Sequence, residues 1–395
     1  MISFDEALEL VRSVARPVGT EVLPLAKAAG RVLARPVAAR IDSPRSDVSS
    51  MDGYAVRERD LTHFPISLRI GGESFAGSAP PASLTPGTCA RIFTGAPLPP
   101  GADRVIVQEN VRREGNTAII DAPPGVACHI RSRGSDFQSG DALLAAGRLL
   151  DSRALVAAAA ADVAELELYR RPRVRILGTG DELAEPGTAR ERPHAIPDSV
   201  SLGIAALAER WGAECIGRVR LADDLAAMRA MAEAAAEATD VIVMTGGASV
   251  GERDFARQMF EPFGLELLFS NVSIKPGKPV WLGRKREQIV MGLPGNPTSA
   301  LVTARLFLAP LLAGMTGQPT ERALGWRKLV LTSAIDECGA RETFHRAQFV
   351  NGKAEILSFQ DSSAQRALAE ADLLVRQPAN SSGLAGGAEV DALDF

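Results

Sequence analysis

Three glycine-rich segments of the sequence could bind an anionic group through their backbone amides. They cover residues 178–182, 245–254 and 292–297, and each follows a short apolar run typical of a buried strand. Glycine permits positive φ angles and a close approach of the main chain, and consecutive N–H groups at a helix start attract phosphate without a charged side chain. Because ligands bind at the carboxyl ends of the strands in open α/β sheets, we expect the three segments to meet at one edge of a sheet.

Two lysines and several acids could complete such a site. Lys275 and Lys278 stand in a segment, 274–279, that two prolines stiffen, and an ammonium group is a good partner for phosphate or another oxyanion. Carboxylates beside a phosphate site suggest a bridging Mg2+. The alternatives are a solvated turn with two surface lysines and, for residues 223 and 224, a helix cap. The acids expected at this edge are Asp181, Glu182, Asp223, Asp224 and Asp254.

The second glycine segment also contains the pattern Gly-x-Ser-x-Gly, with Ser249 at its centre. In α/β hydrolases this pattern carries the nucleophilic serine, which needs an acid and then a histidine later in the chain. Only His345 follows Ser249, in a stretch with strand-like texture. A hydrolase would also leave the other two glycine segments without a role. We therefore favour an anion-binding loop.

The composition is that of a globular protein with more than one domain. The chain has 395 residues, of which 46% are hydrophobic, and its net charge is -4. This length exceeds one ordinary core. No nucleic-acid surface is expected, because the one dense basic cluster, at 284–286, has the position of a solvated hairpin tip. The N-terminus lacks the features of a signal peptide, and the longest apolar stretch, 306–315, is too short to span a membrane.

The cysteines and histidines show no spacing typical of a metal site or a disulfide framework. The four cysteines are scattered and form no Cys-x-x-Cys pair. We therefore expect reduced cysteines, a cytoplasmic protein, and no membrane or nucleic-acid partner. Any metal is expected to be a hard cation bound by carboxylates.

The elements that must position these residues change character along the chain. A capping box at Ser3 and Glu6 predicts an N-terminal helix, and a second short helix is expected over 24–33. Short β-type runs then alternate with Gly/Pro turns, until an alanine-rich helix begins at Asp151. β texture returns from residue 326. Between these regions we expect strands at 174–177, 213–219, 241–244 and 288–291, and helices at 201–211, 223–238, 254–260 and after Pro297.

This order predicts a multidomain α/β protein. Alternating strands and helices are typical of a parallel sheet with helices on both faces. We expect a central, doubly wound α/β domain over residues 171–320 and a small C-terminal β domain over 326–395. Residues 1–40 and 148–170 would form a helical linker domain through paired helices, with a mostly β module, 41–147, inserted into it.

Six motifs, in this order along the chain, resemble those of the MoeA-type molybdopterin molybdenumtransferases. They are SSMDGYAV at 49–56, RIFTGAPLP at 91–99, GTGDEL at 178–183, GGASVGERD at 246–254, KPGKP at 275–279 and LPGNP at 293–297. The resemblance covers nearly the whole chain. It implies insertion of molybdate into adenylylated molybdopterin with release of AMP, the Mg2+-assisted last step of molybdenum cofactor biosynthesis. It also implies a molybdopterin-binding central domain and an elongated homodimer, with a molybdopterin adenylyltransferase and client molybdoenzymes as further partners.

The resemblance also assigns roles to individual residues. The two later glycine loops would hold the pterin and its phosphate, the lysines would meet phosphate or molybdate oxygens, and acids would act near the metal and the anhydride. Residues of the inserted module would approach from the partner subunit, although Asp52 could instead hold the Gly53 backbone and Thr94 could tie down its own turn. The implied catalytic residues are Asp254, Glu182, Lys275, Lys278, Asp52, Thr94 and Asp136; the cofactor-binding residues are Thr245, Gly246, Gly247, Ser249, Gly251, Gly292, Pro294, Gly295, Asn296, Pro297 and Asp198; the metal ligands are Asp254, Glu182 and Asp224.

The chain departs from the family pattern at three places. Val200 replaces an asparagine, residues 45–49 lack an aromatic residue and an asparagine, and the turn at 360–363 is poor in glycine. These differences bear on substrate affinity. They keep a second hypothesis open, a divergent, non-catalytic paralogue that binds the cofactor and delivers it to a client enzyme.

Overall fold

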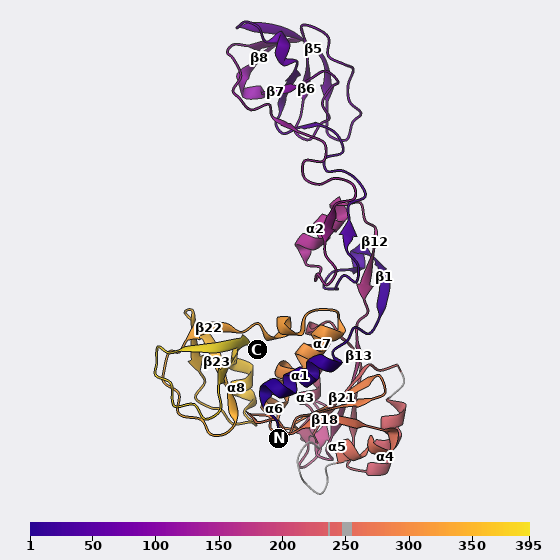
Figure 1. Cartoon of the computed structure of the whole chain (residues 1–395), viewed down its shortest axis with the longest axis vertical. Helices are drawn as coiled ribbons and strands as arrows, with labels where there is room; N and C mark the ends of the chain where they lie inside the picture. Colours follow the sequence, from indigo (N-terminus) through magenta and orange to yellow (C-terminus); the bar gives the residue numbers. More distant parts are fainter. Residues whose placement is uncertain (236–237, 247–254) are drawn as a thin grey trace.

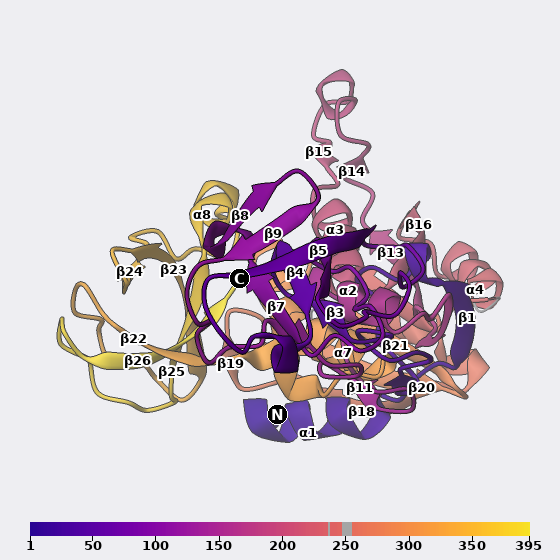
Figure 2. The same cartoon turned by 90° about the horizontal axis from the view of Figure 1, so that it is seen from above.

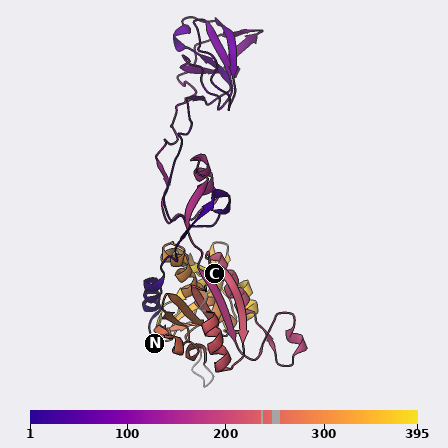
Figure 3. The ribbon, with the colours of Figure 1, turned by 90° about the vertical axis from the view of Figure 1, so that its right-hand side faces the viewer.

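The protein is elongated, and its parts follow one another along the long axis (Figure 1). A computed structural model describes residues 1–235, 238–246 and 255–395. A six-stranded sheet lies at one end, two small two-stranded sheets lie in the middle, and two larger sheets with helices lie at the other end (Figures 1 and 3). Both termini lie in this last part.

The central sheet is mixed, whereas the sequence analysis predicted a parallel sheet. Its strands are β13 (Arg173–Thr179), β16 (Glu214–Leu221), β17 (Val241–Thr245), β18 (Glu266–Ser270), β20 (Trp281–Lys285) and β21 (Gln288–Leu293). In the order β16-β13-β17-β21-β20-β18, the first four are parallel. β20 is antiparallel to both neighbours, because a tight turn with Arg286 at φ 55° joins it to β21.

The basic cluster lies at this hairpin, as expected, but it is not fully solvated. Lys285 is only 9% exposed, and its ammonium nitrogen lies 4.6 Å from the centre of the Phe263 ring. Burial lowers the pKa of Lys285. The prediction of a solvated tip is therefore wrong for Lys285, because its aliphatic stem and its ammonium group both pack against the protein.

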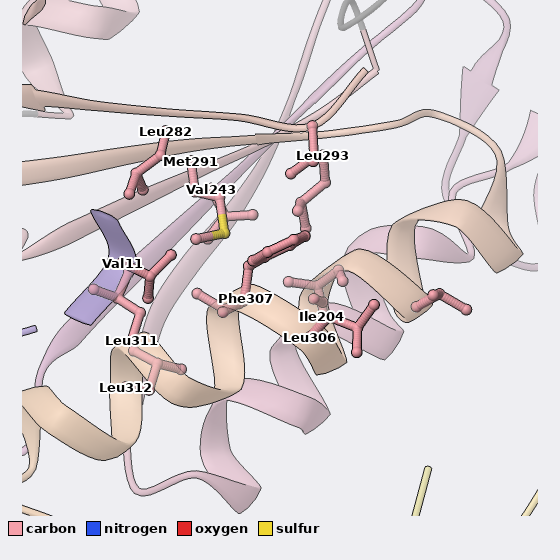
Figure 4. Packing of buried hydrophobic residues seen from close by; sticks show 14 of the residues in the cluster. Val11, Ile204, Val243, Leu282, Met291, Leu293, Leu306, Phe307, Leu311 and Leu312 are labelled. Carbon is pink, nitrogen blue, oxygen red and sulfur yellow. The ribbon is translucent and has the colours of Figure 1, made fainter. Parts of the chain in front are cut away.

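Helices cover both faces of the central sheet, as predicted. Val241 and Val243 pack into one apolar cluster, and Ile242 and Met244 into another, because alternate residues of a strand point to opposite faces. The first face carries α1 (Phe4–Val14), α3 (Val200–Arg210), α6 (Pro297–Thr303), a π-helical turn (Ala304–Leu308) and α7 (Ala309–Met315); the second carries α4 (Leu225–Ala234) and α5 (Phe255–Gln258). Figure 4 shows Val243 and Met291 of the sheet above Phe307 and Leu311 of the long helix.

The N-terminal helix belongs to this core. The predicted capping box is present, since the Ser3 side chain accepts the Glu6 N–H and the Glu6 carboxylate accepts the Ser3 N–H. Phe4, Leu8 and Val11 are buried in the cluster on the first face. The helix that we expected in the linker thus packs against the central domain.

The long helix over 297–315 is apolar enough and, at 19 residues, long enough to cross a membrane. However, 94% of its apolar window is buried inside the protein. It is therefore accounted for as the core helix of the central domain.

Strand pairs, and not the expected helix pair, hold the linker together. β1 (Thr20–Pro24) pairs antiparallel with β12 (Glu165–Tyr169), and β2 (Val37–Ala38) pairs with β11 (Ala142–Leu144). The helix predicted over 24–33 is wrong: β-branched residues favour a strand before Pro24, and only a 3-10 turn, Leu25–Lys27, follows. The helix predicted at Asp151 is confirmed as α2 (Ser152–Ala160), whose N-cap is Asp151.

The inserted module is mostly β, as its texture indicated. Its six-stranded sheet has the order β7-β4-β6-β5-β9-β8, and β3 pairs with β10 beside it. The strands are β3 (Val48–Ser49), β4 (Gly53–Val56), β5 (Ile66–Ser74), β6 (Thr88–Ile92), β7 (Arg104–Val107), β8 (Val111–Glu114), β9 (Thr117–Ile120) and β10 (Ile130–Arg131).

The C-terminal sheet recruits one strand from the lysine segment. The order is β19-β23-β25-β26-β22, with β24 beside β23. β25 and α8 were not predicted. The elements are β19 (Ile274–Lys275), β22 (Arg327–Val330), β23 (Glu342–Val350), β24 (Lys353–Ile356), α8 (Gln365–Glu370), β25 (Leu373–Gln377) and β26 (Glu389–Asp394).

A small arm projects from the central domain. It carries the paired strands β14 (Leu183–Ala184) and β15 (Ile196–Pro197) and stands clear of the other elements (Figure 2). The remaining 3-10 turns are Glu58–Asp60, Gln108–Asn110, Ala189–Glu191, Glu261–Phe263 and Thr320–Leu324.

Arg305, in the π-helical turn, fastens the C-terminal strand to the central domain. Its guanidinium donates to the carbonyl oxygens of Asp394 at 2.7 Å and Ala323 at 2.6 Å. It also lies 5.3 Å from the centre of the Trp211 ring. Burial lowers the pKa of Arg305 to about 10.

We predict that Arg305→Ala strongly destabilises this part of the protein. The change leaves two carbonyl groups without a donor and opens a cavity, so we expect a loss of about 3 kcal/mol and a fall in Tm of about 5–10 °C. Differential scanning calorimetry measures the shift. Arg366→Ala, whose side chain is 94% exposed, is the control and should leave Tm unchanged. Equal Tm values for the two variants would contradict the role of Arg305.

Candidate functional site

The three glycine-rich loops meet around one cavity of about 670 Å³ at the carboxyl edge of the central sheet. Thr179 and Gly180 follow from β13, Thr245 and Gly246 from β17, and the third loop follows β21. The sequence predicted this convergence. The third loop contributes Pro294, Gly295, Asn296 and Pro297.

Main chain lies directly against main chain where the loops meet. Gly246 has a φ of 87°, and a Cβ atom added to it would lie 2.7 Å from the Thr179 carbonyl oxygen. A Cβ atom on Gly295 would lie 3.4 Å from the Gly246 Cα. Only glycine fits at position 246, because any side chain would meet both backbone strain and a steric clash.

The third loop ends at the start of a long helix. Asn296 is the N-cap and makes no side-chain capping hydrogen bond, and Pro297 occupies the first helical turn. Both residues line the cavity. The partial positive charge at a helix start favours an anion there.

The acids near the cavity have different roles. Glu182 lines it and folds back over Gly180, where an added Cβ atom would lie 2.6 Å from a carboxylate oxygen. Asp198 also lines it but is 4% exposed, and its carboxylate accepts hydrogen bonds from the backbone N–H of Ser201 at 3.1 Å and its hydroxyl at 2.6 Å. Asp198 therefore holds the first turn of α3.

Of the two neighbouring aspartates, Asp223 lines the cavity. Asp224 is instead the N-cap of α4 and accepts the Ala227 N–H at 2.9 Å. The helix-cap alternative thus applies to Asp224, which is not among the lining residues. Asp181 accepts the Asp223 N–H at 3.2 Å and orients this turn.

The described residues contain no group of three or more His, Cys, Asp or Glu side chains arranged around a metal. The expected ligand Asp254 lies outside the described residues, as do Gly247, Ser249 and Gly251. Mg2+ typically needs only one or two carboxylates together with water and substrate phosphates. Glu182 and Asp223 are two carboxylate residues that line the cavity.

The lysine segment reaches the cavity through Pro279. Lys275 and Lys278 have exposed side chains, and neither is among the lining residues. Lys275 lies on β19, which pairs in parallel with β23 of the C-terminal sheet. Neither lysine forms an ion pair within the described part of the chain.

Residues that the sequence analysis did not assign also line the cavity. Leu183 and Ile196 come from the base of the arm, while Ser363 and Gln365 come from the C-terminal domain. The Asn296 side-chain amide donates to the Ser362 hydroxyl at 3.1 Å. The weak turn at 360–363 was noted in the sequence, but no local pattern shows that it packs against the third glycine loop.

The inserted module, which contains the three other expected site residues, is separated from the central domain of its own chain by the linker (Figures 1 and 3). Asp52 accepts the Thr94 N–H at 2.7 Å and the Thr94 hydroxyl at 2.8 Å. These hydrogen bonds lower the pKa of Asp52. Asp136 is exposed in a turn, and its N–H donates to the Ser43 carbonyl. Asp52 therefore anchors the Thr94 turn and is ionised at neutral pH.

The histidine required by the hydrolase hypothesis is engaged elsewhere. His345 lies on β23, and its Nε2 is 2.7 Å from the side-chain oxygen of Gln377. Burial lowers the pKa of His345. An amide, and not a carboxylate, thus orients this ring.

Comparisons with known proteins cover all parts of the chain. Residues 2–161 match the MoeA N-terminal region (domain I and II), 175–314 match a probable molybdopterin binding domain, and 328–395 match the MoeA C-terminal region (domain IV). A crystal structure of the molybdopterin biosynthesis moeA protein from Pyrococcus horikoshii OT3 is 28% identical, covers 100% of both chains and has a TM-score of 0.86.

Curated relatives point to the same family. The chain is 36% identical to a molybdopterin molybdenumtransferase of a Nostoc species, and the match covers 82% of this chain and 76% of the relative. It is 35% identical to that of Haemophilus influenzae over 89% of its length and 86% of the relative. These matches, together with the loops that meet at the cavity, show that the chain belongs to the MoeA family of molybdopterin molybdenumtransferases.

Proposed function

We propose that this protein inserts molybdate into adenylylated molybdopterin and releases AMP. The observation that carries the proposal is the meeting of three strand-end glycine loops around one cavity at the start of the long helix. Backbone amides and a helix start suit a phosphate group, and the cavity is large enough for an extended ligand. The named activity of the curated relatives supports this substrate class.

In this proposal, the glycine loops bind the phosphate and orient the substrate. Lys275 and Lys278 extend from the segment beside Pro279 to reach phosphate or molybdate oxygens. Glu182 and Asp223, with Asp254, would hold a Mg2+ ion, and Asp224 remains a helix cap. When bound, the ion would neutralise negative charge on the phosphate oxygens. The backbone amides of the loops, the lysines and the ion would together stabilise the negative charge that develops when the anhydride is cleaved.

A homodimer would complete the site. The six-stranded sheet beside Asp52 and Thr94 lies at the end of the elongated molecule opposite the central sheet (Figure 1), whereas Asp136 precedes Phe137, which is buried in the core of the linker. A second chain in the reverse orientation would bring its module to the cavity, and the ionised Asp52 would face the substrate from there. We further propose that the protein acts in the cytoplasm, between a molybdopterin adenylyltransferase that supplies its substrate and molybdoenzymes that accept its product.

The competing function is non-catalytic binding and delivery of the cofactor. It is favoured by Val200, which lines the cavity with an apolar side chain where the family pattern has an amide. The two functions differ in whether AMP is released.

In the proposed reaction, AMP release depends on molybdate and Mg2+. Purified protein should release AMP from adenylylated molybdopterin only when molybdate and Mg2+ are both present, because both are needed for cleavage and insertion. Chromatography of AMP measures this directly. Tight binding of the substrate with no AMP released under any of these conditions would favour the delivery protein.

The close backbone contact at Gly246 can be tested by substitution. Gly246→Ala should lower kcat/KM about 100-fold, because displacement of Thr179 misplaces the substrate. Gly264→Ala is a matched control: its φ is 75°, but the added Cβ atom has no neighbour within 4 Å. Both changes impose similar backbone strain, so equal activities would disprove the role of the close contact.

The contact between Asp52 and Thr94 makes the stability of the inserted module depend on pH. The pKa of Asp52 is lowered in the folded protein, so the Thr94 contact stabilises the module above about pH 4 and this contribution is lost as pH falls through the lowered pKa. Thr94→Val removes the hydroxyl donor and should raise the Asp52 pKa, measured by carbon-13 NMR titration of its carboxyl. Thr117→Val, on β9 of the same module, should leave it unchanged. An unchanged Asp52 pKa in both variants would show that the Thr94 hydroxyl does not lower the Asp52 pKa.

A further inference from the structure

Lys285 lines a second cavity, on the edge of the central sheet opposite the three glycine loops. This cavity has a volume of about 730 Å³ and lies at the amino ends of β17 and β21, where Thr239 precedes one strand and Gln288 begins the other. No residue of this cavity has a role in the proposed reaction. It is also lined by Glu233, Asp240, Phe263, Arg286 and Glu287.

Lys285 is the only buried lysine of the chain, all of whose lysines lie in the described part. Only six of the 44 lysines and arginines are lysines. Lys285 is 9% exposed. A guanidinium group keeps its proton in proteins, whereas a lysine can become a neutral amine and therefore a nucleophile. The five exposed lysines are Lys27, Lys275, Lys278, Lys328 and Lys353.

The protein gives the ammonium group of Lys285 few polar partners. Its Nζ lies 4.6 Å from the centre of the Phe263 ring, and its hydrogen bond to the Ala232 carbonyl, near the end of α4, is long at 3.5 Å. Lys285 forms no ion pair within the described part of the chain. A lysine that acted as a helix cap or in a salt bridge would make shorter hydrogen bonds. The charge is therefore not neutralised by a partner in the protein.

The surroundings of Lys285 favour its neutral form. Burial lowers the pKa of Lys285, and repulsion by the guanidinium of Arg286, the next residue, lowers it further. Glu233, on α4, acts in the opposite sense but does not outweigh them. At a given pH, a larger fraction of Lys285 than of an exposed lysine is thus unprotonated.

The other two acids of the cavity do not hold the proton on Lys285. Asp240, just before β17, is engaged elsewhere, because its carboxylate accepts hydrogen bonds from the Arg170 guanidinium at 2.9 and 3.0 Å. Glu287 is exposed on the hairpin turn. The cavity therefore combines an amine of lowered pKa with the exposed guanidinium of Arg286.

We propose that Lys285 is a site of covalent modification by acyl phosphates. Its Nζ attacks the carbonyl carbon of the acyl phosphate, an amide bond forms between these two atoms, and the bond from that carbon to the phosphate oxygen breaks. The phosphate leaves with the bonding electron pair, and the surplus proton of Nζ passes to water. Arg286 attracts the phosphate group before it leaves. The product is a neutral amide, which has lost the attraction of the cation to the Phe263 ring.

Treatment of the full-length protein with acetyl phosphate tests the proposal. Mass spectrometry of the digested protein measures the acetylated fraction of each lysine over time. At about pH 8, Lys285 should be acetylated at least about threefold faster than Lys353, because more of it is unprotonated. Lys353 is exposed and Lys328 pairs with Asp391, so both serve as controls within the same molecule.

The pH dependence and one pair of variants identify the cause of the reactivity. The rate at Lys285 should level off at a lower pH than the rate at Lys353, since each rate follows the fraction of unprotonated amine. Arg286→Gln removes the repelling charge and the attraction for phosphate, so it should slow acetylation of Lys285. Arg284→Gln, which removes an exposed arginine paired with Glu266 on the same hairpin, should leave the rate unchanged.

Acetylation of Lys285 that is equal to or slower than that of Lys353 would overturn the inference and make Lys285 a purely structural cation. Equal rates in the Arg286→Gln and Arg284→Gln variants would contradict the role of Arg286. If Arg286→Gln does not fold, the rates and their pH dependence in the wild type still decide. Neither readout requires AMP release, so failure of the proposed function would leave this inference standing.

Discussion

The site depends on one constraint: backbone segments of three loops touch one another at the carboxyl edge of the central sheet. Gly246 lies against Thr179 on one side and Gly295 on the other, with no space for a side chain. The strands behind these loops are held by apolar residues buried on both faces of the sheet. A rigid sheet can therefore bring loops from three strands into one wall without relying on flexible side chains, and such preorganised dipoles suit an anionic ligand.

The C-terminal domain is attached to this site at several separate points. Arg305 binds the carbonyl of Asp394, Ser362 accepts a hydrogen bond from Asn296, and β19 joins the lysine segment to the C-terminal sheet. The positions of Lys275 and of the cavity wall are thus set partly by residues distant in sequence. The C-terminal domain has its own small core, but these contacts fix its position against the central domain. Its sheet supports one side of the cavity.

Much of the central fold could be predicted because it follows from local patterns. The apolar runs of β13, β17 and β21 and the glycines after them identify strands that open into loops at one edge. The sequence analysis placed a hairpin tip at 284–286 but assigned only the strand after it, 288–291, to the sheet, so the antiparallel edge formed by β20 and β18 was missed. The helix over 24–33 failed because Gly30 has a φ of 71° and Val32 and Leu33 form bridges with Leu149 and Leu168 instead.

The site was less predictable than the fold, because side-chain roles depend on contacts between distant segments. The sequence could not distinguish Asp223, on the cavity, from Asp224, in the helix cap. Ser363 and Gln365 line the cavity only because the turn at 360–363 packs against the helix start, and nothing near them in sequence indicates a ligand. The inserted module raises the same difficulty at a larger scale, since its six-stranded sheet lies at the opposite end of the molecule from the central sheet.

A crystal structure of the protein soaked with AMP and pyrophosphate tests the central claim most directly. The account predicts phosphate density between Gly180, Gly246 and Gly295, within hydrogen-bonding distance of their backbone amides and beside the start of the long helix. Phosphate bound elsewhere, with these three loops facing solvent, would contradict it.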